Sequence, residues 1–351
     1  MRIAVDVMGG DHGPVEVIQG VKQAFQSADS DSINQVLLVG REDEIRPILT
    51  RLAWHDSRLE ICHASEVLTM EDKPVEGLRK KKDCSILKAV ELIKDGKADA
   101  IISQGNTGGI VAAAQIRLRR LEGVERPSIA CIMPRVHGEF LLLDGGANPD
   151  ATALHMAQSA VMGSVYYRAM LGNPKPRVGI LSNGSEEGKG TEITREALKL
   201  CRQLDLNFVG YVEGPDLFQG NVEVVVADGF VGNIVLKTIE GMGKAIQTIL
   251  RSELTANPIR KLGAMIASGG LRSLKRRMNP DSYGGAQILG VNGNVIKVHG
   301  SAKAVVVANA LRQTATAFRT HLNNTIVTEI QRANARLSTS ETDTKPASQT
   351  K

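Results

Sequence analysis

Short apolar runs that end in polar, glycine-containing segments recur along the chain. The run Val222–Ala227 is followed by Asp228–Asn233, and apolar residues at helical spacing begin at Ile234. A β-branched run of this kind predicts a buried strand, and the spacing after it predicts a helix. We interpret Asp228–Asn233 as a tight loop at the carboxyl end of a strand. Asn233 is then placed to cap the helix or to direct its amide at a ligand.

The same strand, loop and helix unit occurs at five further places. The strands begin near Ile3, Ala100, Phe140, Val178 and Val295, and the helices after them span Val15–Phe25, Ile110–Leu121, Ala151–Leu171, Glu192–Leu204 and Ala302–Phe318. Strands that alternate with helices predict an α/β fold with a parallel or mixed sheet covered on both faces. Ligands of such sheets bind beyond the carboxyl ends of the strands, where we expect these loops to gather.

A basic, amphipathic segment follows the helix that begins at Ile234. Residues 240–280 contain the end of that long helix and then Thr255–Asn279, in which Leu262 and Met265 share one face. We predict a helical hairpin that turns at Gly269-Gly270. Two interpretations stay open: a dimer interface with a second copy, or a surface that meets an anionic membrane or an acidic protein.

We expect the chain to form one domain followed by a C-terminal tail. Residues 1–335 are expected to form a single α/β catalytic domain, and residues 338–351 have the composition of a disordered tail.

Composition narrows the class of protein. Hydrophobic residues make up 42% of the 351 residues but aromatic residues only 3%, which is typical of an α/β core of Val, Ile, Leu and Ala. The sequence lacks an apolar run long enough to span a membrane, and it enters a strand at once, so we expect a cytoplasmic protein. A net charge of +5 suggests an acidic partner more than nucleic acid. Four scattered cysteines predict neither a metal site nor disulfides.

The polar loops are suited to a small anion that several backbone segments approach together. They contain no complete Gly-x-Gly-x-x-Gly fingerprint and no Walker loop, so support for dinucleotide binding is weak. The aspartates and asparagines among them can equally shape the loops through Asx turns. The candidate binding residues are Asp6, Gly9, Gly10, Asp11, His12, Gly105, Asn106, Thr107, Asp144, Asn148, Asp228 and Gly232.

Seven motifs in order resemble those of the bacterial phosphate acyltransferases, which make acyl phosphate from acyl-acyl carrier protein for phospholipid synthesis. They are Ala4–Asp11, Ser103–Gly108, Leu143–Asn148, Met162–Val165, Glu187–Gly190, Asp228–Asn233 and Tyr283–Gly285, within a resemblance that covers residues 1–330. Two positions depart from the family pattern: Gln104 replaces the usual alanine, and Val231 replaces the usual threonine. No hydroxyl role can therefore be given to position 231.

The resemblance implies a three-layer α/β/α sandwich with a mixed, largely parallel sheet and a protruding helical hairpin. This fold is similar to that of phosphotransacetylases and of the isocitrate/isopropylmalate dehydrogenase group. The resemblance also implies a homodimer that associates peripherally with membranes through Pro258–Met278. Its substrates would be long-chain acyl-acyl carrier protein and inorganic phosphate, with no metal or cofactor, and a membrane glycerol-3-phosphate acyltransferase would use the product. Acyl carrier protein is acidic, which fits the basic segments Arg260–Arg277 and Arg79–Lys82.

The family's catalysis implies roles for Lys189 and Asn233. Phosphate is already a competent nucleophile, so the site has to hold a dianion beside a carbonyl and to stabilise the oxyanion that forms. We assign charge neutralisation to Lys189 and an amide hydrogen bond to Asn233. Taken without the family, Lys189 is an ordinary solvated loop lysine. For Lys237 we favour a surface lysine paired with Glu240, although it could face the same space.

Three other functions stay open, and each has a property that would distinguish it from the carrier-protein acyltransferase. A phosphate- or nucleotide-binding regulatory module would bind ligand without thioester turnover. An oxidoreductase of the dehydrogenase group needs metal-binding aspartates and a cofactor loop. A short-chain phosphate acyltransferase would use coenzyme A thioesters, so the preferred acyl donor separates it from the carrier-protein enzyme.

Overall fold

The computed structural model describes residues 1–27, 32–277 and 283–343. Its strands are β1 (Arg2–Asp6), β2 (Gln35–Gly40), β3 (Leu59–His63), β4 (Ala100–Ser103), β5 (Ser128–Pro134), β6 (Glu139–Leu143), β7 (Arg177–Leu181), β8 (Asn207–Val212), β9 (Val224–Val226), β10 (Ala286–Leu289) and β11 (Asn294–Lys297). Its helices are α1 (Pro14–Phe25), α2 (Glu42–Arg51), α3 (Pro74–Lys80), α4 (Ser85–Lys94), α5 (Thr107–Arg117), α6 (Ala153–Leu171), α7 (Glu192–Gln203), α8 (Gly214–Gln219), α9 (Gly229–Thr255), α10 (Pro258–Ile266), α11 (Ser268–Arg277), α12 (Ala304–Arg319) and α13 (Leu322–Asp343).

The strands form one continuous sheet in the order β3-β2-β1-β4-β11-β10-β5-β6-β9-β7-β8. Pairing is parallel from β3 to β11 and again from β6 to β8, but β10 is antiparallel to both of its neighbours and β5 is antiparallel to β6. The two halves of the sheet therefore run in opposite directions. The expectation that all the loops gather at one edge is wrong, because the carboxyl ends of β1, β4 and β11 point away from those of β6, β7 and β9.

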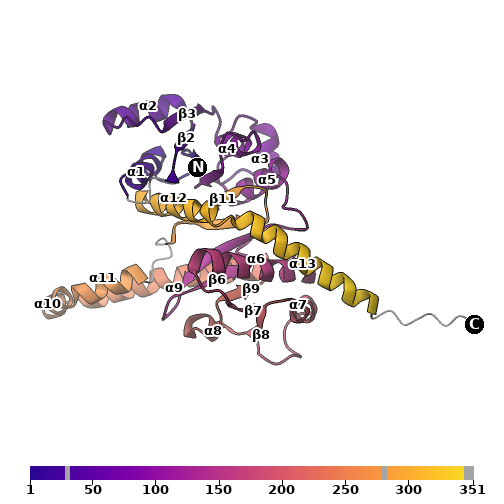
Figure 1. Ribbon diagram of the computed structural model, residues 1–351. Coiled ribbons are helices and arrows are strands. Elements are labelled where there is room, and N and C mark those ends of the chain that lie inside the picture. Colours follow the sequence, from indigo (N-terminus) through magenta and orange to yellow (C-terminus); the bar gives the residue numbers. More distant parts are fainter. Residues whose placement is uncertain (28–31, 278–282, 344–351) are drawn as a thin grey trace, which may run out of the picture.

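Helices cover both faces of the sheet, so the predicted three-layer α/β/α arrangement is confirmed (Figure 1). On one face α1, α2 and α12 pack on the first half and α6, α7 and α13 on the second. On the other face α3, α4 and α5 cover the first half, and the beginning of α9 reaches the second. Alternate residues of each strand enter the two apolar layers, which is the period of two that a sheet buried on both faces requires.

The helix after β9 begins earlier than the pattern predicts. Asp228 is its N-cap and accepts hydrogen bonds from the backbone N–H groups of Phe230 and Val231, both at 2.9 Å. Asp228–Asn233 is therefore not a loop, and Asn233 lies inside α9 instead of capping it. The physical reason is that the Asp228 carboxylate follows the strand directly and satisfies the free N–H groups of the first turn.

The later turns of α9 leave the body of the molecule and form, with α10 and α11, a projecting arm (Figure 1). The turn between α10 and α11 lies at Ala267, so the expected turn at Gly269-Gly270 is wrong: both glycines lie within α11. The apolar side chains of α10 are open to solvent in this single chain, and Ile259 and Ile266 are more than four-fifths exposed.

The C-terminal region contradicts part of one expectation. Helix α13 continues to Asp343, so residues 338–343 are helical and not disordered. The remainder of the expected tail, residues 344–351, lies outside the described residues. Of the helices described, none is both long and apolar enough to cross a membrane.

Candidate active site

A cavity of about 430 Å³ lies where the two halves of the sheet meet at the beginning of α9. Three of the residues expected at the site line it: Asp11, Thr107 and Asn233. Its other polar or titratable lining residues are Cys131, Lys237, Glu240, Tyr283, Lys297 and His299. Because the two halves of the sheet run in opposite directions, the loops after β1, β4 and β11 meet the first turns of α9 around this cavity.

The loops after β1 and β4 are held together beneath this cavity. Ser103 Oγ donates to the carboxylate of Asp6 at 2.6 Å and accepts from the N–H of Gly105 at 3.0 Å. A Cβ at Gly9 would lie 2.4 Å from the Cα of Gly105, so the two loops touch through backbone alone. Asp6 is fully buried, and that burial raises the pKa of its carboxyl. Asp6, Gly9 and Gly105 therefore build the floor of the site and do not line the cavity.

Gln104, which departs from the family pattern, is part of the same floor. Its side-chain amide donates to the carbonyl of Ala302 at 3.0 Å, and the side chain is buried. A Cβ at Gly10 would come within 2.0 Å of Gln104 Oε1, so this longer side chain requires a glycine opposite. Gly10 is thus a contact residue of the loop and does not line the cavity.

Asp144 organises the loop of the opposite half. One carboxylate oxygen accepts from the N–H groups of Ile129, Gly146 and Ala147, and the other accepts from the backbone and side-chain amides of Asn148. Asn148 also donates to the carbonyl of Pro127. A carboxylate offers about four lone-pair positions, so Asp144 has no acceptor capacity left for a substrate. Asp144 and Asn148 fix the loop against which α9 begins.

Helix α9 approaches this loop through its glycines. A Cβ at Gly232 would lie 2.0 Å from the carbonyl oxygen of Asp144, and one at Gly229 would lie 2.7 Å from the backbone of Asn148. The neighbouring Asn233 packs on Gly146 and is half-buried in the cavity wall. Lys237 lines the cavity one turn later and is exposed, as expected of a surface lysine, but within the described residues no ion pair joins it to Glu240.

The other residues expected at the site do not line the cavity, and two of them cap helices. Asn106 is the N-cap of α5: its Oδ1 accepts from the N–H of Gly109, and its amide donates to the carbonyls of Thr69 and Asp72. His12 is exposed and does not line the cavity. Asp228, as described, caps α9.

Lys189 lies on an exposed loop after β7 and does not line the cavity. The stem of its side chain folds over Gly184 of the same loop. Because β6, β7 and β9 are parallel neighbours, this loop shares one edge of the sheet with Asp144 and the start of α9. The structure thus brings Lys189 to the same edge as Asn233 but not into the same cavity.

The sequence reasoning missed Lys297, a buried lysine in the cavity wall. Its amine donates to the main-chain carbonyls of Gln104, at 3.2 Å, and Val298. Burial lowers the pKa of Lys297 to about 8, although the charges of Asp6 and Asp11 oppose this. The available signal was a cation inside an otherwise apolar strand, where an uncharged residue is the rule.

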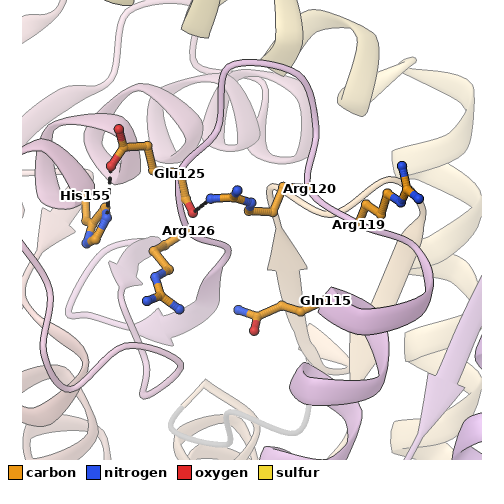
Figure 2. A pocket seen from close by; sticks show the side chains of 6 residues that line it. All are labelled: Gln115, Arg119, Arg120, Glu125, Arg126 and His155. Carbon is orange, nitrogen blue, oxygen red and sulfur yellow. Dashed lines mark hydrogen bonds and ion pairs between the residues drawn. The ribbon is translucent and has the colours of Figure 1, made fainter.

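A second cavity, of about 660 Å³, lies between the end of α5 and the start of α6 (Figure 2). Arg119, Arg120 and Arg126 are among its lining residues, and Arg120 is bonded to the carbonyl of Glu125. The Glu125 carboxylate is 3.2 Å from His155. This cavity is larger but contains none of the expected site residues, so volume alone does not locate the reaction.

Comparison with known proteins agrees with this arrangement. The family model described as "Fatty acid synthesis protein" matches residues 1–325. A phosphate acyltransferase of Heliobacterium modesticaldum is 47% identical over 89% of this chain and 92% of its own, and one of Akkermansia muciniphila is 43% identical over 95% and 96%. A phosphotransacetylase from Streptococcus pyogenes has a similar fold, with a TM-score of 0.61 and 19% identity over 91% of this chain and 94% of its own.

The fold is the α/β architecture of the phosphotransacetylases. Within that class the chain belongs to the phosphate acyltransferase family. The enzyme class expected from the motifs is thereby confirmed. The likeness to the isocitrate/isopropylmalate dehydrogenase group stays a prediction, as does the expectation that neither metal nor cofactor is needed.

Proposed function

We propose that this phosphate acyltransferase moves a long-chain acyl group from acyl carrier protein to inorganic phosphate in the cavity at the start of α9. The observation that carries the proposal is the meeting of Asn233 and Lys237 with the loops of β1, β4 and β11 around one open volume. The amino terminus of α5 reaches this volume through Thr107, and helix amino termini favour anions; Asn233 reaches it from the second turn of α9.

In the reaction, an oxygen of hydrogen phosphate attacks the carbonyl carbon of the thioester. A carbon–oxygen bond forms, the carbon–sulfur bond breaks, and the electron pair of that bond leaves with sulfur. The proton of hydrogen phosphate ends on the carrier thiol, so acyl phosphate and free carrier protein are the products. No side-chain nucleophile is required.

Asn233 donates its amide to the oxyanion of the tetrahedral intermediate. Its side chain makes no hydrogen bond with the part of the chain described, so the amide is available for a ligand. Lys189 contributes positive charge from the edge loop once the acyl donor covers that edge. Loss of one oxyanion donor typically lowers turnover by about 10²–10³.

The enzyme works in the cytoplasm as a homodimer at the membrane surface, with the arm formed by α9, α10 and α11 as its contact. The exposed apolar and basic residues of that arm support this assignment. A membrane glycerol-3-phosphate acyltransferase then uses the acyl phosphate. Acyl carrier protein, which is acidic, docks on basic segments. Among the described residues Arg79, Lys80 and Lys82 form no ion pair and are available for this, whereas Lys81 is bound to Asp72 at 2.5 Å.

The test is release of free thiol from long-chain acyl-acyl carrier protein, with and without inorganic phosphate, beside the same assay on acyl-coenzyme A. Phosphate-dependent release from the carrier-protein donor is expected. Activity on short-chain acyl-coenzyme A alone would move the enzyme to the phosphotransacetylase type, and silence with both donors would refute the proposal.

A further inference from the structure

Lys297 ends β11 in surroundings that rarely hold a cation. Val295, Ile296 and Val298, its neighbours along the chain, are fully buried, and Lys297 itself is only 8% exposed. An ammonium group has three N–H donors. Two are accounted for by the carbonyls of Gln104 and Val298, which leaves one for the cavity that Lys297 lines.

The ammonium has no carboxylate partner of its own. Within residues 1–27, 32–277 and 283–343, no acidic group forms an ion pair with Lys297 within 4.0 Å. Asp6 and Asp11 act on it only through their longer-range fields. A buried charge that is not fully paired is costly, and such groups persist where a ligand completes them. The missing partner here is an anion inside the cavity.

One helix amino terminus and one side-chain amide lie at the same space. Thr107 is the first residue of α5, and Asn233 lies in the second turn of α9. The ring of His299, on the loop after Lys297, faces Ser301: its Nδ1 lies 2.8 Å from the hydroxyl and accepts from the N–H at 3.2 Å. The cavity thus presents an ammonium, an amide and a helix amino terminus, which are the donors that phosphate uses.

We propose that Lys297 is the phosphate-binding cation of this enzyme, and that phosphate lies between its ammonium group, the first turn of α5 and the amide of Asn233. This inference rests on the proposed function and names the part of the cavity that holds the nucleophile. Asp11 and Glu240 also line the cavity and balance the charges of Lys237 and Lys297. The dianion is therefore held at one ammonium group and not by a generally positive surface.

A pH dependence follows from the position of Lys297. Since burial lowers its pKa to about 8, the ammonium is present below pH 8 and is lost as the pH rises through that value. Anion affinity is then retained at neutral pH and falls above pH 8. The thiol of Cys131 and the phenol of Tyr283 have pKa values raised by burial to about 12, so neither titrates in this window. The charged or titratable groups that share the cavity or its floor are Asp6, Asp11, Cys131, Lys237, Glu240, Tyr283 and His299.

Sulfate is the most direct probe, because it remains a dianion across the range in which phosphate changes its own charge. We would measure the dissociation constant of sulfate by calorimetry on the whole enzyme from pH 6 to pH 9.5. For the unmodified protein we expect a constant value at low pH and a rise of about tenfold per pH unit above pH 8. A dissociation constant that stays flat, or that falls as the pH rises, overturns the proposal.

Substitutions of Lys297 distinguish a role in anion binding from a purely structural role. Lys297→Met should weaken sulfate binding at pH 7 by roughly 10- to 100-fold, the loss of a charge-assisted hydrogen bond. Lys297→Arg keeps its charge and should remove the decline above pH 8. Lys303→Met, at an exposed lysine that precedes α12, is the matched control and should bind sulfate normally.

Each remaining outcome is decisive. If Lys297→Met lowers the melting temperature but leaves sulfate affinity unchanged, Lys297 is a structural brace and the proposal fails. Since calorimetry needs no turnover, a lack of thiol release from acyl-acyl carrier protein would refute the proposed function while this assignment is judged separately. Normal turnover together with pH-independent sulfate binding would refute only the role of Lys297.

Discussion

Replacing Gly232 with alanine should separate α9 from the loop that it rests on. The new Cβ would lie 2.0 Å from the carbonyl oxygen of Asp144 and 3.0 Å from the carbonyl carbon. Real Cβ atoms essentially never come within 3.0 Å of another heavy atom, so one of the two backbones has to move by about 1 Å or more. Neither side yields easily: α9 is capped by Asp228, and the Asp144 loop is held by five hydrogen bonds.

Two opposing terms set the size of the effect. Alanine is the better helix former by about 1 kcal/mol, which alone would stabilise α9. Overpacking against rigid structure costs roughly 1–3 kcal/mol and more when backbone has to shift. For Gly232→Ala we therefore expect a net loss of about 2 kcal/mol in the free energy of unfolding. Turnover should also fall, because Asn233 is displaced with the helix.

Gly241→Ala is the matched control in the same helix. It is exposed, and a Cβ there would meet nothing within 4 Å, so the substitution should gain about 0.5–1 kcal/mol and leave activity unchanged. Denaturant unfolding and the thiol-release assay measure both quantities. Equal stability and equal turnover in the two variants would refute the close approach of α9 to Asp144.

Two further predictions concern the site, and one concerns the fold. Asn233→Ala should fold normally and lose about 10²–10³ in turnover; Lys189→Ala should also fold normally and lose most activity, and wild-type turnover in either would contradict its role. Burial raises the pKa of Glu223, but bonds from Arg177 and Arg135 outweigh it and hold that pKa below its usual range. The carboxylate thus stabilises the fold above its ordinary pKa of about 4.3, and this is lost as the pH falls through the depressed value. Glu223→Gln should cost about 3 kcal/mol at pH 7 by denaturant unfolding, with a gap that narrows below pH 4; a constant gap would argue against the ion pairs.

The local elements followed from the sequence because most of the strands are buried on both faces, β3 and β8 excepted. Runs such as Val36–Val39 and Val224–Val226 carry the signal in their own composition. Helix beginnings were less well predicted, since the choice between Asp228 and Asn233 as a cap depends on where β9 ends. Direction within the sheet is not a local property at all. It depends on β10 pairing antiparallel both with β11, its neighbour along the chain, and with β5, which lies more than 150 positions away.

The site residues, too, were predictable where a local motif identifies them and not where their place depends on the order of the strands. Asn233 was predicted from a motif, and the structure places it in the cavity wall. Lys189 was predicted by the same resemblance, but its distance from the cavity could not be known without the order of the strands. Lys297 was overlooked because β11 was interpreted as an apolar strand, and its significance appears only when Gln104 and Val298 are seen to accept its hydrogen bonds.

Hydrogen-bonding capacity distinguishes the residues that build this site from those free to act in it. Asp144 and Asn106 use their acceptors and donors mainly on backbone groups of their own and neighbouring segments, so a substrate that bound them would have to displace structural bonds. The Asn233 amide and the third N–H donor of Lys297 make no hydrogen bond within the described part of the chain. A polar group that is already satisfied gains little from a ligand, whereas a buried one with spare capacity gains the full value of the bond. We therefore propose that the chemistry takes place at the first turns of α9 and the end of β11, two elements that line one cavity together with the glycine-rich loops.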